Sequence, residues 1–258
     1  TVLREVRRQL PGEDIVYFGD TAHLPYGTKS KETITKFSID NVKFLEDLGA
    51  KMIVVACNTA SSLSLDALKE KFFLPIVGVI EPGAKEALAK TKNGRIGVIG
   101  TKATIGSGSY EACLKRIDPS ARVYSEACPL FVPFVEEGWL DGEVVSQVAR
   151  TYLDQLRSFG IDTLILGCTH YPLLTGVIRQ TIGEEVALVN SAEETAKEVR
   201  VLLGELNIHN DGAAGGSETR FYVSDEPEQF RSLGERFLGR SIQSVAKVGD
   251  HVRSSSTG

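Results

Sequence analysis

The sequence has no long apolar run and no excess of basic residues. Its 258 residues carry a formal net charge of -5 at pH 7, from 29 Lys and Arg against 34 Asp and Glu. This balance provides no basic surface, which argues against nucleic acid as a main partner. No apolar stretch is long enough to cross a bilayer, and the N-terminus lacks the charged-then-apolar pattern of a signal peptide. We therefore expect a cytoplasmic protein with no membrane partner.

Cysteine is scarce and its spacing is wide. The four cysteines include no Cys-x-x-Cys pair, and we expect them to be free thiols rather than disulfides. The glycines do not form a G-x-G-x-x-G fingerprint, so NAD binding is not indicated. Cys113 lies on an apolar helical stripe, and Cys128 precedes a proline in an apolar segment, so both are interpreted as core residues. We expect neither a metal nor a cofactor.

Two stretches of the chain share one pattern. Lys51–Ser61 (KMIVVACNTAS) and Asp162–Pro172 (DTLILGCTHYP) each contain an apolar run that ends at a cysteine, Cys57 or Cys168, followed by small polar residues. Such a run predicts a buried parallel strand. In open α/β sheets, ligands bind at the carboxyl ends of the strands, where the next helix offers free N–H groups. A glycine lies at the same spacing upstream of each cysteine, so we predict two duplicated halves that face one site.

Apolar strands alternate with helical patterns along the whole chain, which predicts an α/β fold with mainly parallel sheets. The segment Glu81–Gly83 (EPG) is expected to form a turn and to mark a domain boundary. The opening helix, residues 2–10, leads into a strand at 14–18, and a helix in this position normally follows a strand of its own. We therefore expect an N-terminal strand and its loop to be absent from this sequence.

Three chemistries fit two thiols at strand ends. If Cys57 and Cys168 face each other across a substrate, one thiolate removes a proton from a carbon and the other thiol returns one to the opposite face. This inverts a stereocentre without a cofactor, provided that the thiols have opposite protonation states. A second interpretation is a zinc site of Cys57, Cys168 and His170. A third is a nucleophilic Cys168 with His170 as its base, in acyl transfer.

Each of these residues also has a structural interpretation. A single cysteine at the end of an apolar strand belongs more often to the core, and a single histidine is more often structural than catalytic. Asn58 and Thr59 alone could simply cap the next helix. Glu136 follows an apolar, proline-broken segment and serves equally well as a possible acid or as a solvated helix residue. The matched positions of Cys57 and Cys168 favour a site over the core.

Five motifs together resemble one known group of enzymes. They are PYG at Pro25–Gly27, ACNTAS at Ala56–Ser61, GTKAT at Gly100–Thr104, CPLFVPFVEEG at Cys128–Gly138 and GCTHYP at Gly167–Pro172. The chain resembles the glutamate racemases of the cofactor-independent aspartate/glutamate racemase family along essentially its whole length, and the two cysteine motifs are the most specific marks.

The resemblance implies a role for each motif. Cys57 and Cys168 would be the proton donors and acceptors, one for each enantiomer of glutamate, and Glu136 and His170 would assist their proton transfers. Substrate binding would fall to Pro25, Tyr26, Gly27, Asn58, Thr59, Thr101, Thr104, Thr169 and His170. Related enzymes acting on aspartate, a hydantoin or another carboxylate remain alternatives, as does a protein that binds an amino acid without turnover.

The resemblance also implies an architecture and a biological role. Two pseudo-symmetric α/β domains, residues 1–82 plus 192–250 and residues 83–191, would hold the substrate in the cleft between them, with a frayed tail at 251–258. The protein would be a homodimer that supplies D-glutamate for bacterial peptidoglycan. The family begins with a strand and an Asp-Ser-Gly loop that this sequence lacks, so we expect low activity from the chain as written.

Overall fold

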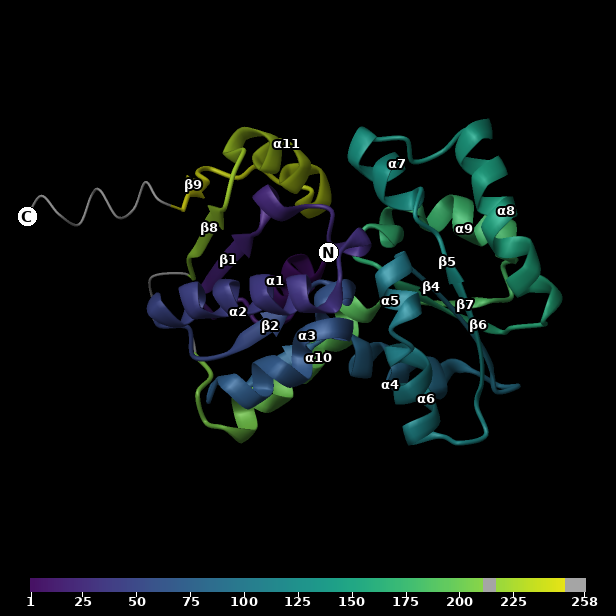
Figure 1. Ribbon diagram of the computed structural model, residues 1–258, viewed down its shortest axis with the longest axis horizontal. Coiled ribbons are helices and arrows are strands. Elements are labelled where there is room, and N and C mark those ends of the chain that lie inside the picture. Colours follow the sequence, from purple (N-terminus) through teal and green to yellow (C-terminus); the bar gives the residue numbers. More distant parts are fainter. Residues whose placement is uncertain (211–216, 249–258) are drawn as a thin grey trace, which may run out of the picture.

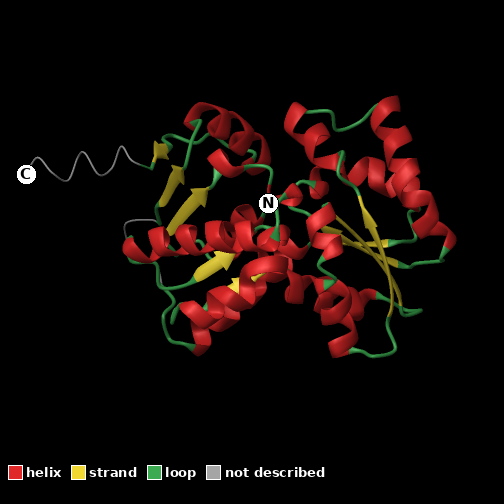
Figure 2. Cartoon of the chain, viewed as in Figure 1, coloured by secondary structure: helices red, strands yellow, loops and turns green. Residues whose placement is uncertain are grey.

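The computed structural model describes residues 1–210 and 217–248 and has an α/β fold built on parallel sheets. Each strand pair among these residues is parallel. Helices (red in Figure 2) lie around the strands (yellow) in both parts of the molecule. The predicted fold class is confirmed. The predicted frayed tail, residues 251–258, lies outside the described residues.

The middle of the chain forms a four-stranded sheet in the order β5-β4-β6-β7. Its strands are β4 (Arg95–Gly100), β5 (Arg122–Ala127), β6 (Thr163–Gly167) and β7 (Ala187–Val189). All of β6 is buried, as expected for a central strand with both faces covered. Because Gly100 of β4 pairs in register with Gly167 of β6, the residues that follow, Thr101 and Cys168, leave the sheet at the same edge.

The remaining strands form two small sheets. One has the order β1-β8-β9 and the other is β2-β3. Their bounds are β1 (Ile15–Gly19), β2 (Ile53–Val55), β3 (Ile76–Gly78), β8 (Thr219–Val223) and β9 (Ala246–Lys247). The C-terminal segment thus returns to the N-terminal part, and Figure 1 shows β8 beside β1. The proposed domain limits, 1–82 plus 192–250 and 83–191, stay a prediction, and residues 249–250 lie outside the described part.

Two helices begin where the chain passes between these groups of strands. They are α4 (Ile80–Lys90), which follows β3, and α10 (Ser191–Glu205), which follows β7. The expected turn at Glu81–Gly83 is wrong, because these residues form the first turn of α4. Proline is compatible with this position, since the N–H groups of a first helical turn have no intrahelical acceptor. A Cβ atom on Gly83 would lie 3.1 Å from the Cβ of Ser191, so glycine allows the two helices to approach closely.

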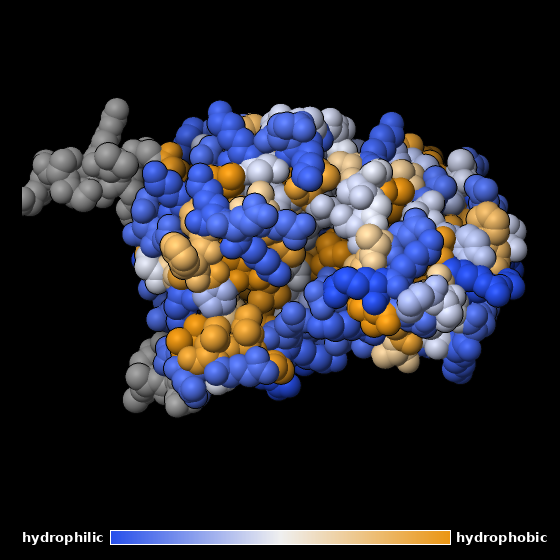
Figure 3. Space-filling view, turned by 60° about the horizontal axis from the view of Figure 1, so that its bottom comes forward, coloured by the Kyte–Doolittle hydropathy of each residue, from blue (hydrophilic) through white to orange (hydrophobic). Residues whose placement is uncertain are grey.

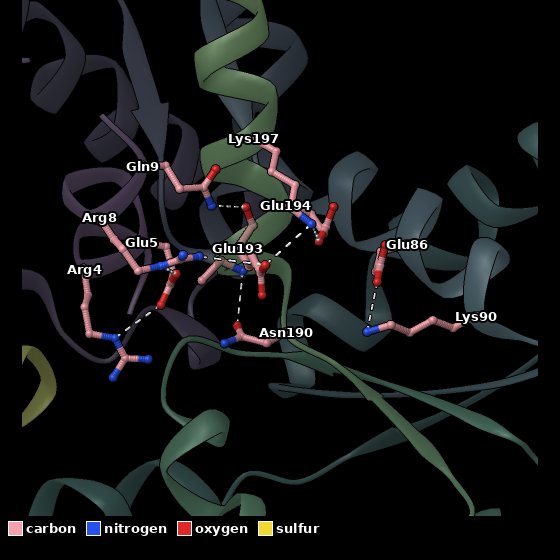
Figure 4. A network of polar contacts seen from close by, with 11 residues as sticks. Arg4, Glu5, Arg8, Gln9, Glu86, Lys90, Asn190, Glu193, Glu194 and Lys197 are labelled. Atoms are coloured by element: carbon pink, nitrogen blue, oxygen red, sulfur yellow. Dashed lines mark hydrogen bonds and ion pairs between the residues drawn. The ribbon is translucent and has the colours of Figure 1, made fainter. Parts of the chain in front are cut away.

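Helix α1 (Val2–Gln9) packs against α10. Its buried side includes Val2 and Val6, and polar contacts surround this apolar contact (Figure 4). The Arg8 guanidinium lies 3.8 Å from the Glu193 carboxylate, and Gln9 Nε2 donates to the Glu193 carbonyl at 3.1 Å. Exposed ion pairs contribute little to stability, so the buried valines are the main anchor of α1.

Most other helices cover the sheets. They are α2 (Lys31–Asp47), α3 (Asn58–Lys71), α5 (Lys102–Gly106), α6 (Ser109–Ile117), α7 (Phe131–Glu137), α8 (Glu143–Ser158), α9 (Thr175–Ile182) and α11 (Pro227–Leu238). The Ser30 hydroxyl caps α2 by accepting a hydrogen bond from the Thr33 N–H. The largest buried cluster joins β4 and β6 to α7, α8 and α9. This core fixes the strand ends that carry the candidate site.

Candidate active site

The first cysteine lies between β2 and α3. Cys57 is the residue before the first turn of α3, and its side chain is half-buried. Burial raises the pKa of this thiol, whereas the N–H groups of Ala60 and Thr59 and the Thr59 hydroxyl act in the opposite direction. These N–H groups belong to the start of a helix, where they have no intrahelical acceptor. The predicted strand, cysteine and helix are therefore present, and the thiol is protonated at neutral pH.

The second cysteine follows β6 directly. Cys168 is 7% exposed, and burial raises its pKa to about 12. The N–H groups of His170 and Tyr171 oppose this shift, while negative charge on Cys57 or Glu136 adds to it. Gly167, directly before Cys168, pairs with Gly100, and the next residue, Thr101, contacts Thr59 at 2.9 Å. The structure thus brings together the two cysteine segments, which are far apart in the sequence.

Three threonine hydroxyls join the two parts of the molecule beside the thiols. Thr59 Oγ1 lies 2.9 Å from Thr101 Oγ1 and 3.2 Å from Thr104 Oγ1, and the last two are 3.1 Å apart. Thr59 belongs to α3, whereas Thr101 and Thr104 follow β4. Gly27 packs on the same group, since a Cβ atom there would lie 2.8 Å from Thr101 Cβ. Three of the predicted binding segments therefore meet at one point.

The Tyr26 side chain is held by polar partners. Its hydroxyl donates to Asp20 and accepts a hydrogen bond from Asn41 Nδ2 at 3.2 Å. Burial, the hydrogen bond to Asp20 and negative charge on Cys57 all raise the pKa of Tyr26. Pro25 comes directly before this residue, at the start of the short 3-10 turn Tyr26–Thr28. The PYG segment is therefore near Cys57 and fixed in place.

His170 lies between the second thiol and a carboxylate. Its Nδ1 is 3.7 Å from Cys168 Sγ, and its Nε2 is 3.3 Å from Glu136 Oε1. The Thr169 hydroxyl lies 3.5 Å from the same Nδ1. The histidine side chain is 23% exposed and the glutamate side chain 41%. The structure therefore aligns Cys168, His170 and Glu136 in a chain along which a proton can be passed and the resulting imidazolium stabilised.

The C-terminal helix α11 contributes two contacts that the sequence analysis missed. Arg236 Nη1 lies 3.4 Å from the Val135 carbonyl oxygen and 3.2 Å from that of Glu136, so it donates to carbonyls at the end of α7. The Phe237 ring packs edge-on against His170, with centroids 5.3 Å apart. Nothing in the local sequence of α11 indicates these contacts, because they depend on how the C-terminal segment returns to the fold.

Asn58 is the first residue of α3 and is buried. Its carboxamide oxygen accepts a hydrogen bond from the Tyr110 hydroxyl at 2.7 Å. Tyr110 lies three residues before Cys113 on the apolar side of α6, and this spacing is typical of core residues rather than of a site. This contact is the third that sequence reasoning missed.

The other cysteines and the metal alternative can be placed as well. Cys113 and Cys128 are buried in apolar clusters, as predicted. Within residues 1–210 and 217–248, no group of three His, Cys, Asp or Glu side chains is placed to hold a metal ion. The zinc interpretation, which needs Cys57, Cys168 and His170 as joint ligands, therefore gains no support.

The chain is similar to known proteins over nearly all of its length. The family model described as Asp/Glu/Hydantoin racemase matches residues 1–199. A glutamate racemase from Geobacter metallireducens is 53% identical over 248 residues, which cover 96% of this chain and 92% of the relative.

Solved structures agree with this similarity. A glutamate racemase from Bacillus anthracis superimposes with a TM-score of 0.92 at 43% identity, covering 96% of this chain and 92% of that one. One from Francisella tularensis, solved in complex with D-glutamate, has a TM-score of 0.89 at 40% identity, with the same coverage of both chains.

Proposed function

The chain belongs to the Asp/Glu/hydantoin racemase family, and from this premise we propose that it interconverts L- and D-glutamate without a cofactor, using Cys57 and Cys168. It is an amino-acid racemase, an isomerase. The observation that carries the two-cysteine proposal is geometric: Thr59, two residues after Cys57, lies 2.9 Å from Thr101, which leaves the sheet beside Cys168 because Gly100 pairs with Gly167. The Francisella relative, solved with D-glutamate, supports glutamate as the ligand.

The reaction removes one proton from Cα of glutamate and adds another proton to the opposite face of the same carbon. A thiolate takes the Cα proton from one face of glutamate, which leaves the electron pair delocalised into the α-carboxylate. The opposite thiol then donates its proton to the other face, so the product has inverted configuration and the two sulfurs have exchanged protonation states. Thiols suit this exchange because their ordinary pKa of roughly 8.5 lies close to neutrality.

The thiols need help to reach opposite protonation states. Burial raises the pKa of both Cys57 and Cys168, so each is protonated at neutral pH before the substrate binds. The ammonium group of glutamate brings a positive charge to the site, which lowers the pKa of a nearby thiol. His170 is placed to accept the Cys168 proton, and Glu136 stabilises the imidazolium that results. For Cys57, the N–H groups at the start of α3 stabilise the thiolate.

The carboxylates of glutamate are matched by hydrogen-bond donors. The Asn58 carboxamide offers Nδ2, which is buried and without a hydrogen-bond partner in the described part of the chain, as a donor for one carboxylate. The hydroxyls of Thr59, Thr101 and Thr104, which lie within hydrogen-bond distance of one another, can turn toward an anion that enters between them. These donors would fix both ends of the substrate while its Cα lies between the sulfurs.

Solvent exchange tests the proposed reaction. Incubation of L- or D-glutamate with the chain in deuterated water is expected to place deuterium at Cα of the inverted product, detected by proton NMR and chiral chromatography. Exchange with aspartate but not with glutamate would instead support the aspartate alternative. Glutamate binding without exchange would support a protein that binds the amino acid but does not turn it over, and would overturn the proposal.

Removal of the Glu136 charge is expected to slow turnover. Glu136→Gln should lower kcat/KM for glutamate by about tenfold, because an orienting, charge-assisted hydrogen bond typically contributes roughly 1.5–3 kcal/mol. The matched control is Glu137→Gln, which removes the same charge one residue further along α7, where the side chain is exposed. Steady-state kinetics in both directions measure the effect. Equal loss in the two variants would show that only the local charge matters and not the contact with His170.

The biological setting belongs to the same proposal. D-glutamate production would serve peptidoglycan biosynthesis, and thereby cell wall biogenesis and cell shape, in the cytoplasm. None of the helices in the described part of the chain is both long and apolar enough to cross a membrane. We retain the predicted homodimer, which light scattering can test. Phe73 and Trp139 are strongly exposed, and Figure 3 shows hydrophobic patches (orange) among hydrophilic residues on one face.

A further inference from the structure

We propose that Tyr110 is a positioning residue that fixes the two cysteine segments relative to each other and sets the orientation of the Asn58 carboxamide. The proposal rests on the racemase function, because that function is what requires two sulfurs at a fixed separation. Tyr110 lies on α6 and is 3% exposed, so it acts through its neighbours.

The first contact is with the Cys57 segment. The Tyr110 hydroxyl donates to Asn58 Oδ1 at 2.7 Å. Within the described part of the chain, Asn58 Nδ2 is buried and has no hydrogen-bond partner. An unpaired buried donor destabilises the folded state by roughly 1–3 kcal/mol, so its presence in a fold calls for an explanation. Because Tyr110 occupies the oxygen, the N–H₂ end of the carboxamide is left to donate to a substrate oxygen.

The second contact is with the Cys168 segment. Gly167 is the last residue of β6 and directly precedes Cys168. A Cβ atom on Gly167 would lie 3.1 Å from Tyr110 Cε2, so the ring packs against the backbone at this point. The buried Tyr110 side chain therefore contacts Gly167, which precedes Cys168, and Asn58, which follows Cys57.

The third contact is at the two helices that connect the parts of the molecule. Ser191, at the start of α10, lies close to Gly83, since a Cβ atom on Gly83 would be 3.1 Å from Ser191 Cβ. A Cβ atom on Gly83, in the first turn of α4, would lie 3.5 Å from the Tyr110 hydroxyl oxygen. The Tyr110 side chain thus contacts both cysteine segments and lies beside the starts of α4 and α10.

Substitution by phenylalanine separates this role from simple packing. Tyr110→Phe keeps the ring but releases the Asn58 carboxamide, so KM for L- and D-glutamate is expected to rise about tenfold, with a smaller change in kcat. The control is Tyr152→Phe on α8, whose hydroxyl accepts only a long hydrogen bond of 3.4 Å from the Leu130 N–H. That variant should keep KM within twofold of the parent chain.

A double-mutant cycle tests whether the effect passes through Asn58. Asn58→Ala is expected to raise KM on its own, and Tyr110→Phe added to it should change KM by less than twofold, because the carboxamide is no longer present. A tenfold rise that persists in the Asn58→Ala background would overturn the proposal. So would a KM within twofold of the parent for Tyr110→Phe alone.

A spectroscopic measurement makes the test independent of turnover. The Asn58 carboxamide signals in a ¹H–¹⁵N spectrum, assigned by their loss in Asn58→Ala, should shift in Tyr110→Phe and stay in place in Tyr152→Phe. Unchanged signals in Tyr110→Phe contradict the positioning role whether or not the chain racemises glutamate. A shift in a chain without racemase activity would confirm the contact and overturn only the proposed function.

Discussion

Replacement of Cys57 or Cys168 by serine is expected to lower glutamate racemisation by about 10³-fold. Positioned acids and bases typically accelerate a step by roughly 10²–10⁴-fold, and a serine hydroxyl ionises too weakly to act as a base near neutrality. The side chains are nearly isosteric, so the fold should be retained. Racemisation is measured by circular dichroism of the glutamate enantiomers over time.

The other two cysteines provide matched controls. Cys113→Ser removes a buried thiol that accepts a hydrogen bond from Arg116 Nη2 at 3.6 Å, and it should leave racemisation within about twofold of the parent chain. Cys128→Ser extends the comparison to a second thiol in the core of the middle sheet. If either cysteine of the candidate pair tolerates serine as well as Cys113 does, the two-base proposal is wrong.

In the cysteine variants, exchange of the Cα proton with solvent should occur without inversion of configuration. The equilibrium constant between two enantiomers is one, so kcat/KM must be the same in both directions for any variant. Steady-state rates alone therefore cannot assign a cysteine to an enantiomer. A variant with one working thiol can still remove the Cα proton of one enantiomer and return solvent deuterium to the same face. Each serine variant should thus exchange one enantiomer without inversion, and the two should differ in which one.

The sequence predicts those parts of the site whose position depends on a short stretch of neighbouring residues. Cys57 and Cys168 each follow a short apolar strand, and the register of Gly100 with Gly167 places Thr101 at the same edge of the sheet. An unbroken run of apolar residues is enough to locate such a strand and its end, because a parallel strand that is buried on both faces does not alternate with polar residues. The α/β class follows from the same pattern.

The parts that the sequence does not predict depend on contacts between distant segments. Tyr110 lies 52 positions from Asn58, and Arg236 lies 100 positions from Glu136. Neither residue stands in a motif, and a tyrosine on an apolar helical stripe predicts core packing. The turn expected at Glu81–Gly83 was wrong for a local reason, because proline is compatible with the first turn of a helix and these residues begin α4. The domain limits and the roles of the site residues stay predictions.

The protonation states are a further property that the pattern could not provide. The sequence argument requires opposite states for Cys57 and Cys168, yet burial raises the pKa of both thiols in the chain alone. The asymmetry must therefore come with the substrate or through His170. The raised pKa of the two thiols also affects stability, because a thiol that resists ionisation in the folded state ionises more readily in the unfolded chain.

Alkaline pH is accordingly expected to destabilise the fold. Burial raises the pKa of Cys168 from its ordinary value near 9.0 to about 12. Above pH 9 the unfolded chain releases this proton while the folded chain retains it, so stability is full below pH 9 and is lost as the pH rises toward 12. One such group contributes a loss of about 1.4 kcal/mol per pH unit in this window. Urea unfolding at pH 8, 9, 10 and 11 measures it.

Other buried groups shift in the same direction and make the expected loss larger. Burial also raises the pKa of Cys57 and Cys128, and of Tyr110 and Tyr171, so these groups too resist ionisation in the fold. Comparison of the parent with Cys168→Ser isolates one of them, since the variant should lose about 1 kcal/mol less between pH 9 and pH 10. An unfolding free energy that is the same at pH 8 and pH 10 would mean that the thiols ionise freely within the fold. Cys57 and Cys168 would then not need the substrate ammonium to generate a thiolate.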